Sequence, residues 1–81
     1  MTKNGLTIER HAEIGSALKN ILQLLAELQC ELSVAYPFAG KKGRPFHYID
    51  GAKGKVNSAR CYLEYNLYAD FPEDATPDIY Y

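Results

Sequence analysis

The sequence predicts an all-α fold, in which two long amphipathic helices form an antiparallel hairpin that assembles into a helical bundle oligomer. Apolar residues recur at steps of four and three positions in the first half of the chain and, more weakly, in the second. A segment rich in proline and glycine separates the two halves. No segment shows the period of two that a half-buried strand requires. With 81 residues, the chain forms one domain (1–81), small enough that it usually needs another subunit for stability.

The first helix is expected over about residues 7–35. Thr7 is the expected N-cap, Glu9 follows in the first turn, and Tyr36-Pro37 ends the helix because a residue before proline avoids helical torsions. Its apolar stripe is widened by neighbouring residues, so it is too broad for one partner helix to cover. We therefore predict an oligomer core made of Ile14, Leu18, Ile21, Leu25, Leu28 and Leu32.

A basic loop is expected over residues 37–47, and the second helix over about residues 50–70. Gly51 and Gly54 each cost about 1 kcal/mol relative to alanine in a helix, so they predict a soft helix start near Asp50. Ala52 and Ala59 are expected to let this helix approach the first one closely. Phe71-Pro72 ends the helix.

An extended tail is expected over residues 71–81. It is acidic at first and ends in Ile79-Tyr80-Tyr81. A purely solvated tail has little need of these three side chains, so we expect them to dock on the hairpin or on another subunit.

The charge is unevenly distributed although the formal net charge is only -1. Six basic residues and one acid lie between Gly40 and Arg60, whereas five acids and no Lys or Arg follow Cys61. Clustered basic side chains beside aromatic rings suit an anionic nucleotide, with phosphate bound near a helix N-terminus and a base stacked on a ring. The predicted phosphate contacts are Lys41, Lys42, Arg44, Lys53, Lys55 and Arg60. The predicted stacking residues are His47, Tyr48, Tyr62 and Tyr65. The alternative interpretation is a polar loop whose lysines serve solubility.

Other chemistries find little support in the sequence. Cys30 and Cys61 are isolated and His11 lies far from His47, so neither a metal site nor a cofactor is expected. No serine or cysteine is paired with a histidine and an acid in a catalytic pattern, so we expect no enzyme. No stretch is apolar enough to cross a membrane, no secretory signal opens the chain, and a cytoplasmic location with reduced cysteines is expected. Duplex DNA is an unlikely partner because the chain as a whole is not basic.

The end of the chain resembles known proteins. Asp70-Phe71-Pro72-Glu73 and Asp78-Ile79-Tyr80-Tyr81, after a helix that contains Arg60, are similar to the ends of small uncharacterised proteins from phages and mobile elements of Gram-positive bacteria. In size and shape, a short oligomerising helical hairpin also resembles the phage sponge proteins that sequester cyclic-nucleotide immune signals, the anti-CBASS and anti-Thoeris hairpins. The likeness implies a viral anti-defence role but assigns no binding residue.

These observations lead to two functional hypotheses, beside the plainer interpretation of a structural bundle protein whose only activity is assembly. The first is a non-enzymatic, phage-type anti-defence protein that forms an oligomer and sequesters an anionic nucleotide signal. The second is a protein–protein inhibitor or adaptor that binds a host enzyme through the tyrosine face of the second helix and the C-terminal tail, since aromatic residues are frequent anchors of such surfaces.

Overall fold

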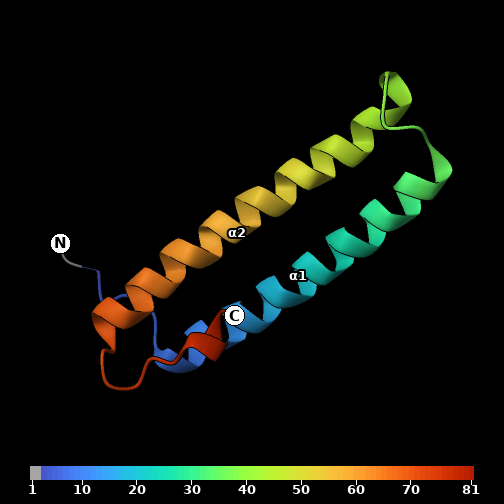
Figure 1. Cartoon of the computed structure of the whole chain (residues 1–81). Helices are drawn as coiled ribbons and strands as arrows, with labels where there is room; N and C mark the ends of the chain where they lie inside the picture. Colours follow the sequence, from blue (N-terminus) through green and yellow to red (C-terminus); the bar gives the residue numbers. More distant parts are fainter. Residues whose placement is uncertain (1–2) are drawn as a thin grey trace.

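Two antiparallel helices account for most of the computed structural model, which describes residues 3–81 (Figure 1). Helix α1 spans Ile8–Ala35 and helix α2 spans Arg44–Asp70. A short 3₁₀ turn, η1 (Lys41–Gly43), precedes α2, and a second one, η2 (Pro77–Ile79), lies in the tail. The molecule measures 47 × 26 × 14 Å, so it is one helix thick. The predicted all-α hairpin is thus confirmed.

The ends of α1 follow the sequence signals. The Thr7 hydroxyl accepts a hydrogen bond from the Arg10 amide, which satisfies one of the unpaired N–H groups of the first turn. At the other end the Tyr36 amide still donates to Leu32 O, but the backbone of Tyr36 is extended, as the following proline requires. Both boundaries lie within one residue of the prediction.

Helix α2 begins at Arg44, six residues before the expected cap at Asp50. Pro45 occupies the first turn, where its fixed φ suits a helix and no amide hydrogen is needed. Arg44 to His47 are therefore helical, and the connection is shorter than the predicted 37–47 loop. Gly51 and Gly54 lie within the helix with open space around them, so the prediction of a soft helix start near these glycines was wrong.

The surface of α1 that faces α2 is rotated relative to the predicted stripe. The residues that face α2 and the tail are again spaced four and three positions apart: His11, Gly15, Leu18, Leu22, Leu25, Gln29 and Leu32. Of the predicted oligomer core, Leu18, Leu25, Leu32 and Ile14 are half-buried, whereas Ile21 and Leu28 are 42% and 46% exposed. The reason is that the apolar stripe of α1 is wide enough to contain two overlapping series of residues spaced four and three positions apart. Helix α2 covers only one of these series.

The corresponding surface of α2 consists of Phe46, Ile49, Lys53, Val56, Arg60, Leu63 and Leu67. Ala52 and Ala59, which were expected to bring the helices together, are exposed instead. Toward the loop end of the contact, Gln29 of α1 donates to Asp50 (Nε2–Oδ1, 3.0 Å) and accepts from Lys53 (Oε1–Nζ, 2.8 Å). This polar cluster fixes the lengthwise register of the two helices, because sliding either helix would leave the nearly buried amide of Gln29 without partners.

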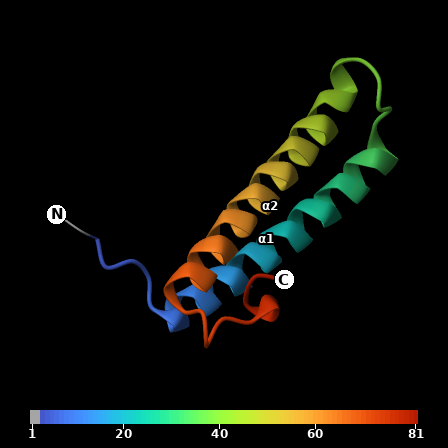
Figure 2. The same cartoon turned by 60° about the vertical axis from the view of Figure 1, so that its left-hand side comes forward.

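The tail folds back onto the open end of the hairpin and contributes to its core (Figure 2). Tyr80 and Leu67 are fully buried, and His11 is 1% exposed. Hydrogen bonds between backbone groups, donated by the amides of Asp74, Ala75, Ile79 and Tyr81, keep the segment compact. The expected extended tail is therefore partly helical, and its aromatic end docks on the same chain.

Candidate functional site

The loop end of the hairpin is held in one conformation by aromatic contacts. The rings of Phe38 and Phe46 meet edge-to-face with centroids 4.9 Å apart, and His47 lies edge-on to Phe46 at 5.6 Å. His47 Nε2 is 2.9 Å from Phe38 O, so this nitrogen donates to the carbonyl. Gly43 is needed here, because a Cβ at this position would lie 2.1 Å from Phe38 O. The connection is therefore a packed turn rather than an open loop.

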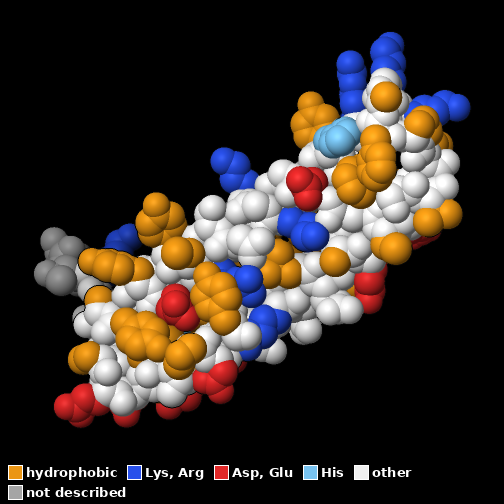
Figure 3. All heavy atoms as spheres, in the orientation of Figure 1, with side chains coloured by type: hydrophobic (Ala, Val, Ile, Leu, Met, Phe, Trp, Pro, Cys, Tyr) orange, Lys and Arg blue, Asp and Glu red, His pale blue; other side chains and the backbone are white. Residues whose placement is uncertain are grey.

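Three basic side chains project from this turn. Lys41 and Lys42 belong to η1, Arg44 opens α2, and all three are exposed. Within residues 3–81 none of them makes a side-chain hydrogen bond or an ion pair, since the one ion pair there joins Arg10 to Glu13. Figure 3 shows their cationic ends gathered at the loop end of the molecule.

The electrostatic environment of this cluster is positive. No acidic residue occurs between Glu31 and Asp50, and the Asp50 carboxylate already accepts a hydrogen bond from Gln29. No side chain caps the first turn of α2, so the positive end of the helix dipole adds to the basic charges. Tyr48 lies one turn into α2 and is 78% exposed, which leaves its ring free for stacking.

The ten predicted ligand-binding residues do not form one site. The structure brings together Lys41, Lys42, Arg44, His47 and Tyr48 at the loop end. Arg60 lies 16 residues beyond Arg44 on the same helix, which is about 24 Å along the axis. Within one chain, a single small nucleotide cannot contact both Arg44 and Arg60.

The remaining predicted residues have other surroundings. Lys53 donates to Gln29 in the polar cluster between the helices, and Lys55 is exposed further along α2. Tyr62 and Tyr65 are 73% and 72% exposed. Their rings point to solvent, well beyond the loop end.

Arg60 serves the tail. Its guanidinium donates to Asn57 Oδ1 (2.8 Å) and to Tyr80 O (3.4 Å) and lies 4.0 Å from the centroid of the Tyr81 ring. A cation over an aromatic face is an attractive arrangement. Lys19 on α1 adds a hydrogen bond from Nζ to Asp78 O (2.6 Å). Two basic side chains, one from each helix, therefore hold the last four residues.

A buried histidine–tyrosine contact lies beneath these interactions. His11 Nδ1 is hydrogen-bonded to the Tyr80 hydroxyl, and the two rings meet edge-to-face with centroids 5.7 Å apart. Phe71 closes the other side of His11 at 6.2 Å. Burial raises the pKa of the Tyr80 phenol, because the ionised form would lose its hydration. The sequence analysis did not find this contact, because the two partners lie 69 residues apart and no local pattern links them.

Gly15 makes this contact possible. Tail residues cross α1 so closely that a Cβ on Gly15 would lie 1.9 Å from Ile79 O. At the tail's surface the Thr76 hydroxyl donates to Asp78 Oδ1 in a compact turn. That hydrogen bond, then one from the backbone, lowers the pKa of the Asp78 carboxyl. We call the contacts of Ile79, Tyr80 and Tyr81 with His11, Gly15 and Arg60 the tail latch.

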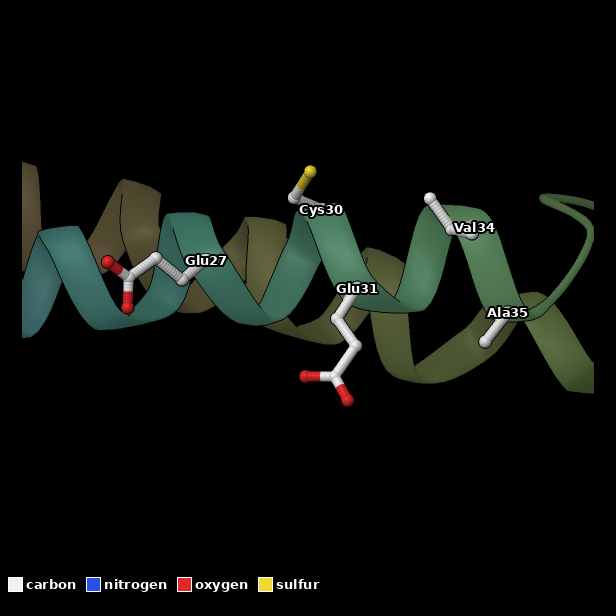
Figure 4. A pocket seen from close by; sticks show the side chains of 5 residues that line it. All are labelled: Glu27, Cys30, Glu31, Val34 and Ala35. Carbon is white, nitrogen blue, oxygen red and sulfur yellow. The ribbon is translucent and has the colours of Figure 1, made fainter.

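A surface depression lies elsewhere, on the outer side of α1. It is lined by Glu27, Cys30, Glu31, Val34 and Ala35. Figure 4 shows that these side chains spread apart along the helix rather than converge on one point. None of the predicted ligand-binding residues takes part. Cys30 is exposed.

Among residues 3–81, no three or more His, Cys, Asp or Glu side chains converge as metal ligands, and neither helix has a stretch that could cross a bilayer. Comparison with protein-family models, curated proteins and solved structures likewise gave no match. The function must therefore be argued from the geometry of this chain alone.

Proposed function

We propose that this protein is a non-enzymatic binding protein whose loop end captures an anionic ligand, with a nucleotide as the best candidate. The observation that supports this most strongly is the set of Lys41, Lys42 and Arg44, three exposed cations without an acidic partner among the described residues. They are mounted on a packed turn, so little backbone entropy is lost when a ligand binds. Three donors of this kind suit a phosphate.

Tyr48 supports a nucleotide over a simple inorganic anion. It is exposed and lies one helical turn from Arg44, so a base could stack on its ring while the phosphates contact the basic side chains. Sequestration of a cyclic-nucleotide immune signal, the role that the resemblance to phage sponge proteins implies, is one specific form of this proposal. Lys53, Lys55 and Arg60 would contribute only where a second subunit brings them near the loop end of the first.

Self-association is the second part of the proposal. Ile21, Leu24 and Leu28 of α1 are 42%, 58% and 46% exposed in the isolated chain. Large apolar side chains in a continuous stripe favour burial in an assembly. A bundle oligomer would complete the small core that two helices can form by themselves.

Titration calorimetry against cyclic di- and trinucleotides, with inorganic phosphate for comparison, tests ligand binding. We expect a micromolar affinity for a nucleotide that falls at least tenfold in the Lys41→Gln/Lys42→Gln double variant. Lys3→Gln is the matched control, because it removes an exposed lysine from the opposite end and should leave the affinity unchanged. No measurable heat with any nucleotide at micromolar protein would refute the proposal.

The alternative, a protein-binding inhibitor or adaptor, is favoured by the exposed rings of Tyr62 and Tyr65 on α2. The tail is a poor candidate for such a contact, because Tyr80 is fully buried in the latch. The variant Tyr62→Ser/Tyr65→Ser should abolish retention of a specific host protein on the immobilised chain if this alternative holds. Retention that survives in this variant would exclude a tyrosine-mediated contact.

A further inference from the structure

One broad side of the hairpin carries apolar side chains that nothing in the described part of the chain covers. Each of these side chains comes one position before a residue of the helix contact. On α1 the following residue faces α2 or the tail, and on α2 the following residue faces α1. The α1 set is Ile14, Ala17, Ile21, Leu24 and Leu28, and the α2 set is Ala52, Ala59 and Tyr62. Leu24 and Tyr62 are more than half exposed. We call this surface the bare face.

The two sets share one side of the molecule. The residue one position earlier in an α-helix points 100° away from the residue that follows it. When two helices are antiparallel, the residues that precede the contact residues therefore point to the same side of the helix pair. The tail lies on the opposite side, because it contacts Lys19, which follows rather than precedes Leu18. Figures 1 and 2 agree in placing the tail over one side of the helix pair only.

The charge distribution indicates what covers the bare face. Lys41, Lys42 and Arg44 make the loop end positive, and the open end carries Asp70, Glu73, Asp74 and Asp78 in the segment that contains no Lys or Arg (Figure 3). The molecule is therefore electrically polarised along its 47 Å length. A second copy laid antiparallel on the first would bring opposite charges together at both ends, whereas a parallel copy would place the two positive ends side by side.

We propose that a second copy of this chain covers the bare face in an antiparallel, two-fold symmetric arrangement. This inference rests on the proposed self-association and specifies its surface and direction. The symmetry axis crosses the helices, so α1 packs on α1 and α2 on α2. Because the α1 set runs from Ile14 to Leu28, its centre, Ile21, lies beside Ile21 of the other copy. Leu28 then meets Ile14, and Glu31 comes near Arg10, which adds an opposite-charge contact on each side of the axis.

The surface is tested by single substitutions on α1. Light scattering of the unmodified chain should give twice the monomer mass of 9.1 kDa at tens of micromolar. Ile21→Glu should give a monomer that keeps its helical circular dichroism, because Ile21 is 42% exposed in the single chain and a glutamate there can extend into solvent once the second copy is absent. Ala26→Glu is the matched control. Ala26 is exposed on the same helix and follows Leu25, so it lies on the tail side, and this variant should remain a dimer.

The direction is tested by cross-linking and by a distance measurement. In a Cys30→Ser/Cys61→Ser background, Ile21→Cys should form an intermolecular disulfide on mild oxidation and Ala26→Cys should not. A spin label at Val34, which is 86% exposed, lies 13 residues from Ile21. The antiparallel dimer predicts about 39 Å along the axis between the two labels, whereas a parallel dimer keeps them within about 25 Å.

Three results would overturn the inference: a monomeric unmodified chain, a dimer that survives Ile21→Glu, or a short Val34–Val34 distance. Ligand binding can be judged separately from the same variants. If Ile21→Glu is monomeric and still binds the nucleotide, the loop end acts alone. If the dimer forms as described and no nucleotide binds, the anion-binding proposal fails and the proposed dimer is still supported.

Discussion

Alanine substitution of two glycines, one under the tail and one on open surface, provides a sensitive test of the tail latch. Gly15 lies where a Cβ would collide with Ile79 O at 1.9 Å, whereas Gly54 has no atom within 4 Å of its virtual Cβ. Both lie within helices with ordinary negative φ angles, so both variants gain the same helix propensity, about 1 kcal/mol. The difference between them therefore isolates the cost of the collision.

The magnitude follows from these two contributions. Gly54→Ala should raise the free energy of unfolding by about 1 kcal/mol, which corresponds to a rise of about 4–8 °C in Tm for a domain of this size. In Gly15→Ala the backbone atoms of Ile79 must move, and forced overpacking costs about 1–3 kcal/mol. Gly15→Ala should thus be about 1–3 kcal/mol less stable than Gly54→Ala, and equal to or below the unmodified chain.

Urea unfolding followed by circular dichroism at 222 nm measures the stability difference at one protein concentration, which must be held constant for a chain that associates. Hydrogen exchange of the Ile79 and Tyr81 amides reports on the latch itself, because these amides donate within the tail to Thr76 O and Pro77 O. We expect faster exchange in Gly15→Ala only. Equal stability and equal exchange in the two alanine variants would show that the tail does not pack on Gly15.

Further predictions concern the same contacts. Tyr80→Phe should cost about 1–2 kcal/mol, because His11 Nδ1 loses its buried partner, and Tyr80→Ala should cost about 3–5 kcal/mol in urea unfolding. The raised pKa of Tyr80 means that its contribution to stability is complete below pH 10.0 and is lost as the pH rises through its folded-state pKa. Alkaline titration at 295 nm should therefore show one tyrosine that ionises last and is missing in Tyr80→Phe; an unchanged curve would contradict burial of the phenol. The lowered pKa of Asp78 means that its contribution is present above about pH 3.8 and is lost as the pH falls through its lower folded-state value. Thr76→Val should move the NMR-measured pKa of Asp78 upward, and no movement would exclude the hydroxyl as the cause.

The sequence predicted a helix end correctly where that end depends only on neighbouring residues. Thr7 and the Tyr36-Pro37 pair mark the ends of α1 because capping and proline sterics involve only neighbouring residues. The start of α2 was misjudged because Pro45 can end one element or open the next, and its neighbours alone do not distinguish the two cases.

The face of each helix that enters the core was harder to predict. The α1 stripe contains two overlapping 4–3 series, and both satisfy the periodicity. Gln29 shows why composition misleads here: its amide is nearly buried because Asp50 and Lys53 of α2 supply its hydrogen-bond partners. A polar residue can therefore face the partner helix while Ile21 and Leu28 remain exposed.

The candidate site was predicted in part. Lys41, Lys42, Arg44, His47 and Tyr48 cluster as their closeness in sequence suggested, because the turn and the first turn of α2 keep neighbours together. Arg60, Tyr62 and Tyr65 seemed part of the same basic-aromatic segment, but a straight helix carries them about 24–32 Å from Arg44. Arg60 is also occupied by Tyr80 and Tyr81.

The sequence by itself determined that the chain is helical, where α1 begins and ends, where α2 ends, and that positive and negative charge lie at different positions along the chain. These properties depend on residues close together in sequence. Only the tertiary structure decided that His11 pairs with Tyr80, that Gly15 lets the tail cross α1, and that one side of the hairpin stays bare. Each of these depends on which segments pack together, and that choice is made by the sum of many weak contacts between residues distant in sequence.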